Sequence, residues 1–365
     1  MRSPREESTR GVSPPGGLHA FANRVIAGIG IAIGLLLPVS ILWLSASALL
    51  VLFGGLLLGV LLRTLALWLA GEGRRMRVGA ALTIVVAVLT AGGMAAAWAM
   101  APQLSRQVDE LSRTLPNAIQ SLLGRLEGYG WGRYLIEAFE RMDLAALPAA
   151  ELFDRAGRVF TSSLWAAAKF LFFLFVGLYL AAEPERYRRG LLFLLPVGRR
   201  ERASEVLGAV EHSLRWWLLG QVISMALLGV STTLLLWLLD MPLALILGLF
   251  VAVMTFVPYA GPWIAGAPIV ALVLAEDPGK AALLVVLYTG IQVAEGYFIT
   301  PMIFRAVVEL PPALTLGVQL VMGTLLGALG FVLATPLLVV ILVLMQHVYV
   351  RDWLGDPSIF PARSE

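Results

Sequence analysis

Long apolar stretches, separated by short charged ones, make up most of the chain. Stretches of about 20 residues with few charges are typical of helices that cross a bilayer. Their hydrophobicity is continuous, not alternating, which favours helices over membrane-barrel strands. Residues 25–62 are too long for one span and predict two helices joined near 38–47. We therefore predict an all-α integral membrane protein with about eight transmembrane segments: three within 25–101, one over 161–182 and four within 216–348, the sixth broken or re-entrant.

Charged residues concentrate in two stretches between these segments. Residues 102–160 carry balanced charges, and apolar residues recur at helical spacing from Leu104 to Leu115, which predicts a small amphipathic helical domain outside the bilayer. We expect Pro102 to end the third segment, because proline interrupts helices. Residues 183–215 are basic and amphipathic, which is typical of a helix on a cytoplasmic membrane surface.

The placement of arginine and lysine predicts the orientation. Basic residues concentrate in 63–77 and 183–215, so we place these stretches in the cytoplasm. Both termini then lie in the cytoplasm, as a disordered tail over 1–24 and a second tail over 349–365. The same arrangement puts Lys280 inside and the amphipathic domain outside. We expect a multi-pass protein of a bacterial inner, or plasma, membrane.

Composition argues against several function classes. The chain is 59% hydrophobic and 14% charged, whereas soluble proteins carry about 25% charged residues. It has no cysteine, and its three histidines lie too far apart in sequence to form a metal-ligand pattern. No phosphate-binding GxxxxGK[ST] loop and no nucleophile–base pair is visible. We therefore expect no enzymatic activity, no cofactor, no metal and no nucleic-acid partner.

The most informative local feature is residues 256–263, FVPYAGPW, which we call the break. Two prolines and a glycine at Pro258, Gly261 and Pro262 do not fit an unbroken helix. Non-helical backbone at membrane depth is tolerated only where protein or a water-filled cavity satisfies its polar groups. In transporters such groups can meet a polar solute. Pro258, Tyr259, Gly261 and Pro262 are therefore transport-pathway candidates, and a kink with a purely structural role is the alternative.

An acid, Glu295, lies in the predicted seventh segment, 281–298. Tyr288, Gln292 and Glu295 share one helical face at i, i+4 and i+7. An ionised carboxylate in lipid costs at least about 3 kcal/mol, so it must face a partner or water. We predict that this face and the break line one polar cavity near mid-membrane, with Glu295 as a proton-relay candidate. A structural hydrogen bond to the break is the alternative.

The last apolar stretch carries Gln319, Gly323, Gly327 and Gly330 on nearly one face. Small residues let helices approach closely, as in GxxxG motifs. We therefore predict that the three glycines, together with Pro336, form a helix-packing seam. Gln319 joins the transport-pathway candidates.

Two further patterns are less specific. Gln221, Ser224 and Ser231 form a polar stripe in the fifth segment, which we interpret as a packing feature. A GxxxG pattern also occurs at Gly55 and Gly59. Because small-residue faces favour self-association, we expect a homo-oligomer.

Several of these motifs together resemble the AI-2E transporter family, which includes autoinducer-2 exporter-like and PerM-like permeases. The matching residues, in order, are VPYAGP (257–262), EGYFITP (295–301), and the glycine run 323–330 that ends at ATP (334–336), with flanking agreement at 102–116 and 194–221. The resemblance covers about residues 25–350. It implies an eight-segment membrane permease that assembles as an oligomer, and it does not specify the solute.

We therefore predict a secondary permease that exports a small polar solute such as the autoinducer-2 signal. One alternative is a monovalent cation (Na⁺)/proton antiporter, which requires a titrating carboxylate such as Glu295. A second alternative is a non-transporting membrane scaffold whose outer domain binds a partner. The expected partners are membrane lipid, the solute or a cation and proton, and further copies of the chain.

Overall fold

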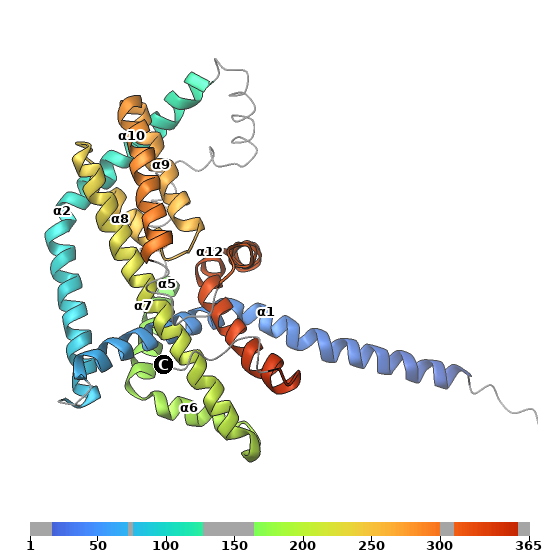
Figure 1. Cartoon of the computed structure of the whole chain (residues 1–365). Helices are drawn as coiled ribbons and strands as arrows, with labels where there is room; N and C mark the ends of the chain where they lie inside the picture. Colours follow the sequence, from blue (N-terminus) through green and yellow to red (C-terminus); the bar gives the residue numbers. More distant parts are fainter. Residues whose placement is uncertain (1–16, 72–75, 127–163, 300–309, 357–365) are drawn as a thin grey trace, which may run out of the picture. The chain divides into compact units, whose positions relative to one another are not determined.

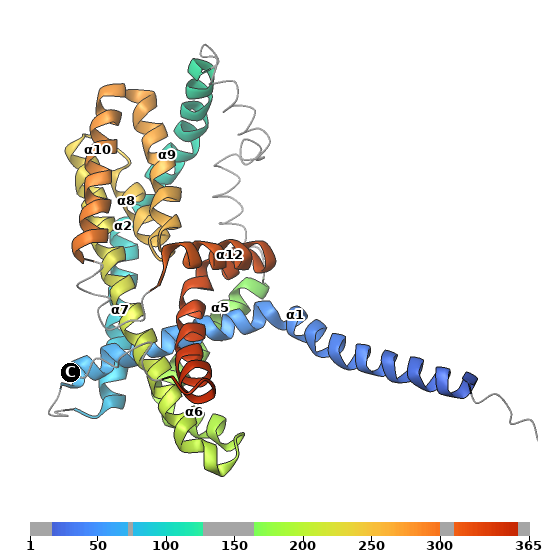
Figure 2. The same cartoon turned by 45° about the vertical axis from the view of Figure 1, so that its right-hand side comes forward.

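The computed structural model describes residues 17–71, 76–126, 164–299 and 310–356, and every element within these ranges is a helix (Figures 1 and 2). The prediction of an all-α chain is therefore confirmed for these residues. The first 16 residues, the last nine and the part of the amphipathic domain from residue 127 onward lie outside them. The chain falls into two compact units, Met1–Leu49 and Leu50–Glu365.

The first helix, α1 (Gly17–Ala70), is continuous over 54 residues. The expectation of two helices joined near 38–47 is therefore wrong, and the expected tail 1–24 is helical from residue 17. The sequence around 38–47 is apolar with scattered serines and has no Gly-Pro or Asn-Gly turn signal. Nothing there offers the backbone an alternative to helical hydrogen bonds, and prolines are tolerated in membrane helices.

The second helix, α2 (Val78–Leu126), also runs further than predicted, because Pro102 does not end it. Beyond this proline, contacts with distant parts of the chain hold the helix. Leu111 and Leu115 are buried in a cluster with α7, α8, α9 and α10. The Gln107 amide donates to the Pro242 carbonyl at 2.6 Å and accepts from the Ile246 amide at 2.9 Å. Tertiary contacts have therefore overridden a local helix-stop signal.

Helix α5 (Leu164–Ala182) lies within the predicted fourth segment and contacts the second-unit part of α1. A Cβ atom added at Gly55 would lie 2.8 Å from Val176 Cγ1, and one at Gly177 would lie 2.8 Å from Leu58 Cδ2. One at Gly59 would lie 3.0 Å from the Gly177 carbonyl oxygen. This GxxxG pattern therefore permits close helix approach within one chain.

The basic stretch 183–215 forms α6 (Pro184–Phe193), the short η1 (Val197–Arg199) and the first part of α7 (Arg200–Leu238). The Arg202 guanidinium contacts Asp352 at 3.0 Å and Glu205 at 2.6 Å, and it donates to the His347 carbonyl. The start of α7 is therefore attached to the C-terminal η4 (Met345–Trp353).

The broken sixth segment forms two helices, α8 (Ala244–Met254) and α9 (Ala260–Glu276), followed by α10 (Pro278–Ala294) and η2 (Glu295–Ile299). The Lys280 ammonium donates to the Leu239 carbonyl at 2.9 Å, so the turns before α8 and after α9 lie together. Helices α8 and α9 therefore form a hairpin, and α9 and α10 lie side by side in both views (Figures 1 and 2). Lys280, which we predict to lie in the cytoplasm, is therefore next to the turn between α7 and α8.

The last long helix, α12 (Pro312–Leu344), bends back on itself at Gly327. Gly327 has φ 69° and ψ −156°, a backbone conformation that favours glycine. A Cβ atom at Gly330 would lie 2.3 Å from the Met322 carbonyl oxygen, and one at Gly323 would lie 3.3 Å from the Phe331 ring. The glycines of the predicted seam thus bring the two halves of α12 together.

In the described part of the chain, four helices are long and apolar enough to cross a membrane. They are Leu44–Ala70, Val78–Leu115, Val197–Leu238 and Pro312–Trp353, and shorter apolar helices occur at Ala168–Ala182, Ala244–Met254 and Ala260–Glu276. The chain is therefore a multi-pass membrane protein. The count of eight spans stays a prediction.

Candidate functional site

The break forms the tip of the α8–α9 hairpin and contains a strained turn. Tyr259 has φ 64° and ψ −56°, and the Ala260 amide donates to the Pro258 carbonyl at 2.8 Å. These angles and this bond define a γ-turn of the positive-φ type, which is rare and strained. Residues other than glycine adopt positive φ at a cost of about 1–3 kcal/mol. Such strain is often found where backbone meets a ligand or moves.

Gly261 is required by the same turn. A Cβ atom at this position would lie 1.8 Å from the Met254 carbonyl oxygen, which is backbone and cannot move aside as a side chain does. The Gly261 amide donates to the Val257 carbonyl at 2.9 Å, and the Val257 amide donates to the Met254 carbonyl at 3.0 Å. Amides of the break are therefore largely satisfied within the turn, by the carbonyls of Met254, Val257 and Pro258.

Three carbonyls in or beside the break accept hydrogen bonds from three different helices. From α7, the Gln221 amide donates to the Thr255 carbonyl. From α10, the Tyr288 hydroxyl donates to the Pro262 carbonyl at 2.8 Å. From α12, the Gln319 amide donates to the Pro258 carbonyl at 3.0 Å and to the Thr335 hydroxyl at 3.1 Å. The break is thus the point at which α7, α10 and α12 meet through polar side chains.

Glu295 lies where α10 ends and the π-helical turn η2 begins. The Ser224 hydroxyl of α7 donates to Glu295 Oε1 at 2.8 Å, and Ser224 is only 3% exposed. Tyr259 of the break is an electrostatic neighbour of the same carboxylate. Single π-helical turns are frequent at functional sites. Glu295 therefore belongs to the polar cluster around the break, and its hydrogen bond to Ser224 differs from the expected alternative of a bond to the break backbone.

The predicted face of α10 is divided between two neighbours, since Tyr288 contacts α9 and Glu295 contacts α7. Gln292 lies between them, close to the Tyr288 hydroxyl. Gln319 Oε1 is buried without a hydrogen-bond partner among the described residues, in a side chain that is only 1% exposed. Unpaired buried polar atoms are rare in folded proteins. The Gln319 amide therefore has hydrogen-bonding capacity that the described residues do not use.

Gln221 and Ser224, which we interpret from the sequence as packing residues, take part in the polar cluster. Both are buried, and both donate hydrogen bonds to the cluster around the break. The signal was present in the sequence, because polar residues at i and i+3 in an apolar helix share one face. Which helix that face meets depends on the α8–α9 hairpin, which the periodicity of α7 does not reveal.

The predicted seam residues Gly323, Gly327 and Gly330 lie in α12, close to Gln319 in sequence. Pro336 is buried directly after Thr335, the hydroxyl that accepts from Gln319. The bend at Gly327 therefore places Gln319 and Thr335, on opposite halves of α12, within hydrogen-bonding distance of each other. The glycines of the seam therefore also position Gln319, a residue of the candidate site.

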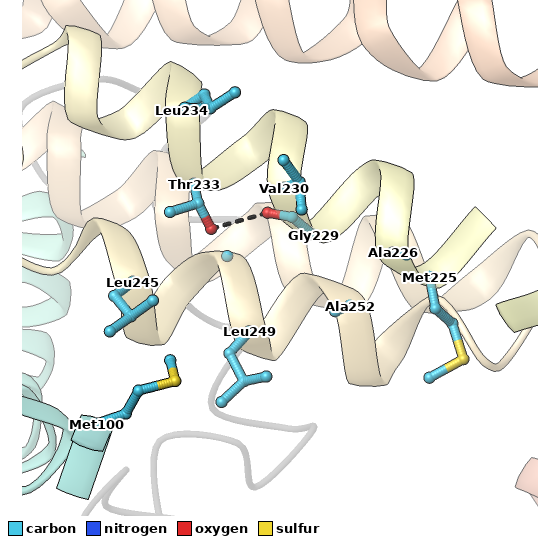
Figure 3. A pocket seen from close by; sticks show the side chains of 11 residues that line it. Met100, Met225, Ala226, Gly229, Val230, Thr233, Leu234, Leu245, Leu249 and Ala252 are labelled. Atoms are coloured by element: carbon cyan, nitrogen blue, oxygen red, sulfur yellow. Dashed lines mark hydrogen bonds between the residues drawn. The ribbon is translucent and has the colours of Figure 1, made fainter. Parts of the chain in front are cut away.

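A cavity of about 300 Å³ lies between α2, α7 and α8, at a different place from the predicted polar cavity (Figure 3). Its lining is apolar apart from Thr233, whose hydroxyl donates to the Gly229 carbonyl at 2.8 Å. In the described ranges, no cluster of three or more histidine or acidic side chains suited to a metal ion occurs. The polar chemistry of the described chain is therefore centred on the break.

Comparisons with known proteins agree with the resemblance of the motifs. The family model described as "AI-2E family transporter" matches residues 31–350. The Bacillus subtilis (strain 168) protein named "Putative transport protein YrrI" is 33% identical over 175 residues, which are 47% of this chain and 49% of that protein. "Putative transport protein YueF" of the same organism is 23% identical over 167 residues, 46% of this chain and 45% of that protein. The matched part therefore spans about half the length of these curated relatives.

Proposed function

Because the chain belongs to the AI-2E family of transporters, we propose that it is a secondary permease that exports a small polar solute, such as the autoinducer-2 signal, past the break and Glu295. The observation that carries this proposal is the set of three carbonyls, in or beside the break, that accept from three helices. Each such bond contributes only about 1 kcal/mol net. A polar solute can therefore replace one of them at little cost, which is what a passage site requires.

The proposal includes a topology in which α8 and α9 form a re-entrant hairpin and do not cross the membrane. Gln107, Pro242 and Lys280 belong to one group of contacts near the C-terminal end of α7, and Arg202 and Asp352 belong to another at its start. Helix α7 has 39 residues and is about 58 Å long, which exceeds the ~30 Å of bilayer hydrocarbon. The two groups therefore suit opposite sides of the membrane, the first outside and the second inside.

Cysteine labelling tests this topology, since the chain contains no native cysteine. Asn117, Glu201 and Glu276 are exposed positions for single-cysteine variants. In intact spheroplasts, an impermeant thiol reagent should label Asn117→Cys and Glu276→Cys but not Glu201→Cys. Detergent-solubilised samples, in which all three should react, are the control. If Glu276→Cys is protected in intact spheroplasts, as Glu201→Cys should be, the two positions lie on the same side. The α8–α9 segment would then cross the membrane.

Glu295 supports proton coupling of the transport step. Its carboxylate accepts a hydrogen bond from the Ser224 hydroxyl of α7. A carboxyl group there can exchange a proton as its surroundings change during transport. A carboxylate beside a hydroxyl also suits a monovalent cation, so cation/proton antiport is the second candidate function, and the nature of the transported species decides between them.

A flux assay in proteoliposomes tests both candidates. Efflux of small neutral polar solutes and of Na⁺ is measured at several pH values, for the natural chain and for Glu295→Gln. The matched control is Glu276→Gln, the same substitution at an exposed position at the end of α9. We expect solute flux with a pH dependence that Glu295→Gln removes and Glu276→Gln retains.

Each outcome has a distinct meaning. Sodium flux without solute flux would replace export by antiport. Solute flux whose pH dependence survives in Glu295→Gln would disprove proton coupling through this residue and leave the permease proposal standing. No flux of any tested species, from protein that is folded and inserted, would favour a non-transporting scaffold.

A further inference from the structure

The apolar cavity between α2, α7 and α8 is separate from the cluster around the break and has its own chemistry. Its volume is about 300 Å³, and ligand pockets in proteins start at about this size. Met100 of α2 and Met225 of α7 lie toward opposite ends of the lining, with Leu245 and Leu249 of α8 between them (Figure 3). Methionine side chains adapt to irregular apolar ligands. The cavity thus has the size and the lining of a binding site.

The cavity offers a ligand very little polarity. Its lining has one polar side chain, Thr233, whose proton is already donated to the Gly229 carbonyl of the preceding helical turn (Figure 3). Gly229 and Gly248 bring α7 and α8 close together here, since a Cβ atom at Gly248 would lie 1.8 Å from Thr233 Oγ1. A ligand with hydrogen-bonding groups would have to leave them unpaired, which is costly in an apolar site. The ligand should therefore be a hydrocarbon.

The rim of the cavity is exposed apolar surface. Val230 is 59% exposed, Leu234 is 52% exposed and Leu249 is 42% exposed. Helices α2 and α7, which contribute Met100 and Met225, are candidate membrane spans. In a membrane, an apolar cavity that opens between such side chains faces acyl chains at high concentration. If the cavity were empty, the side chains that line it would lose dispersion contacts.

We propose that the acyl chain of a membrane lipid occupies this cavity. At roughly 30 Å³ for each small group, a volume of this size holds about ten carbon atoms, a substantial part of one acyl chain. The acyl chain lies against the part of α8 that precedes the break, since Ala252 lines the cavity and α8 ends at Met254. Ala226 of α7 lines it too and lies two residues from Ser224, which binds Glu295. A bound lipid therefore supports the position of α8 next to the candidate site.

The test is photo-cross-linking with phospholipids that carry a diazirine at successive acyl positions, in bilayers that contain the full chain. Adducts are located by mass spectrometry of peptides. We expect at least threefold more adduct on Met225 and Leu249 than on Val286, an exposed residue of α10 outside the cavity. Val286 is 66% exposed, so a random encounter with lipid would favour it instead.

A cavity-filling pair of variants makes the test specific. Ala226→Phe should reduce the adducts on Met225 and Leu249 at least threefold. The matched control is Val222→Phe, which places the same ring one turn away on an exposed position outside the lining. Equal adducts on cavity residues and Val286, or protein–protein cross-links at the cavity that show a second copy of the chain covering it, would overturn the proposal. If Ala226→Phe does not fold, the adducts on Met225 and Leu249 compared with those on Val286 in the natural chain still test the proposal.

Discussion

The two ends of the α8–α9 hairpin are held in different ways. At its base, formed by the turns 239–243 and 277–280, both atoms of the Gln107 amide are paired, and Lys280 bonds Leu239. At its tip, the break, three carbonyls in or beside it accept hydrogen bonds from side chains of α7, α10 and α12. The tip also contains the strained Tyr259. Base and tip belong to the same two helices, yet only the tip combines backbone strain with an unpaired amide oxygen nearby, at Gln319.

This difference indicates which part can move. A buried polar group that is fully paired resists change, because each lost partner costs about 1–3 kcal/mol. The tip begins with stored strain and has an unpaired amide oxygen nearby, at Gln319. A conformational change there costs less, because new bonds can replace old ones and the strain can be relieved. We therefore expect the base to anchor the hairpin and the tip to respond to the solute.

The largest effect should come from Gly261→Ala, which prevents the tip from forming. The added methyl group meets the Met254 carbonyl oxygen, so the break must rearrange, and we expect a loss of about 3 kcal/mol of stability. Thermal unfolding in detergent measures it. The matched control is Gly290→Ala in α10, where a Cβ atom meets nothing within 4 Å and should stabilise the helix by about 0.5–1 kcal/mol. Equal stability of the two variants would show that the tip is not held as described.

A second, smaller effect should come from Gln107→Leu at the base. Its Oε1 accepts from the Ile246 amide in the first turn of α8 and so acts as a cap supplied by another helix. We expect a loss of about 2 kcal/mol of stability and an unchanged flux per folded molecule. Thermal unfolding and proteoliposome flux measured on one preparation separate the two quantities. If Gln107→Leu lowered the flux and left the stability unchanged, the base would take part in transport and would not differ from the tip in this respect.

Gln319→Leu at the tip should show the reverse pattern. Pro258 keeps its bond from the Ala260 amide, and the unpaired Gln319 Oε1 disappears, so the stability loss should be about 1 kcal/mol or less. If this amide contacts the solute, flux should fall roughly tenfold, which corresponds to a contact of about 1.4 kcal/mol in the transport step. Flux equal to that of the natural chain would assign Gln319 a purely structural role.

The smallest effect should come from Ser224→Ala, which removes one donor to a partly exposed carboxylate. We expect a stability change of about 0.5 kcal/mol and a reduced flux, since the Glu295 carboxylate loses the hydrogen bond that holds it against α7. Ser231→Ala on the same helix is the control. A flux identical to that of the control would separate Ser224 from the transport step.

Sequence patterns predicted the helical class, the break and the polar residues that meet there, because each leaves a local signal. Proline and glycine mark the break, and isolated polar residues stand out in apolar helices. Tyr288 and Gln319 bond carbonyls of the break, whereas Glu295 bonds Ser224 of α7, and the polar cavity that they were predicted to share stays a prediction. The sequence also identified residues 323–330 as a place of close contact.

The sequence could not show how the segments turn. Pro102 carries a stop signal, yet α2 continues because distant partners hold Gln107 and Leu111. Hydrophobic periodicity does not predict the hairpin of α8 and α9 or the bend at Gly327 either. It shows which face of a helix is apolar, and it does not show where the backbone turns. Lys280 illustrates the result: counting charges assigns it a side of the membrane but no partner, whereas in the structure its ammonium group bonds the Leu239 carbonyl at the end of α7. Partners distant in sequence decided each of these cases.

The bond from Gln319 to Pro258 has a consequence for biosynthesis. Gln221 and Tyr288 leave the ribosome soon before and after the break, so α7, α8, α9 and α10 can assemble as they are made. The third donor arrives 61 residues after Pro258, and its position depends on Thr335, still later in the chain. Since folding proceeds from the N-terminus during synthesis, we expect the tip to lack its third donor until α12 has been made. The last helix to be synthesised then completes the hydrogen bonds of the hairpin tip.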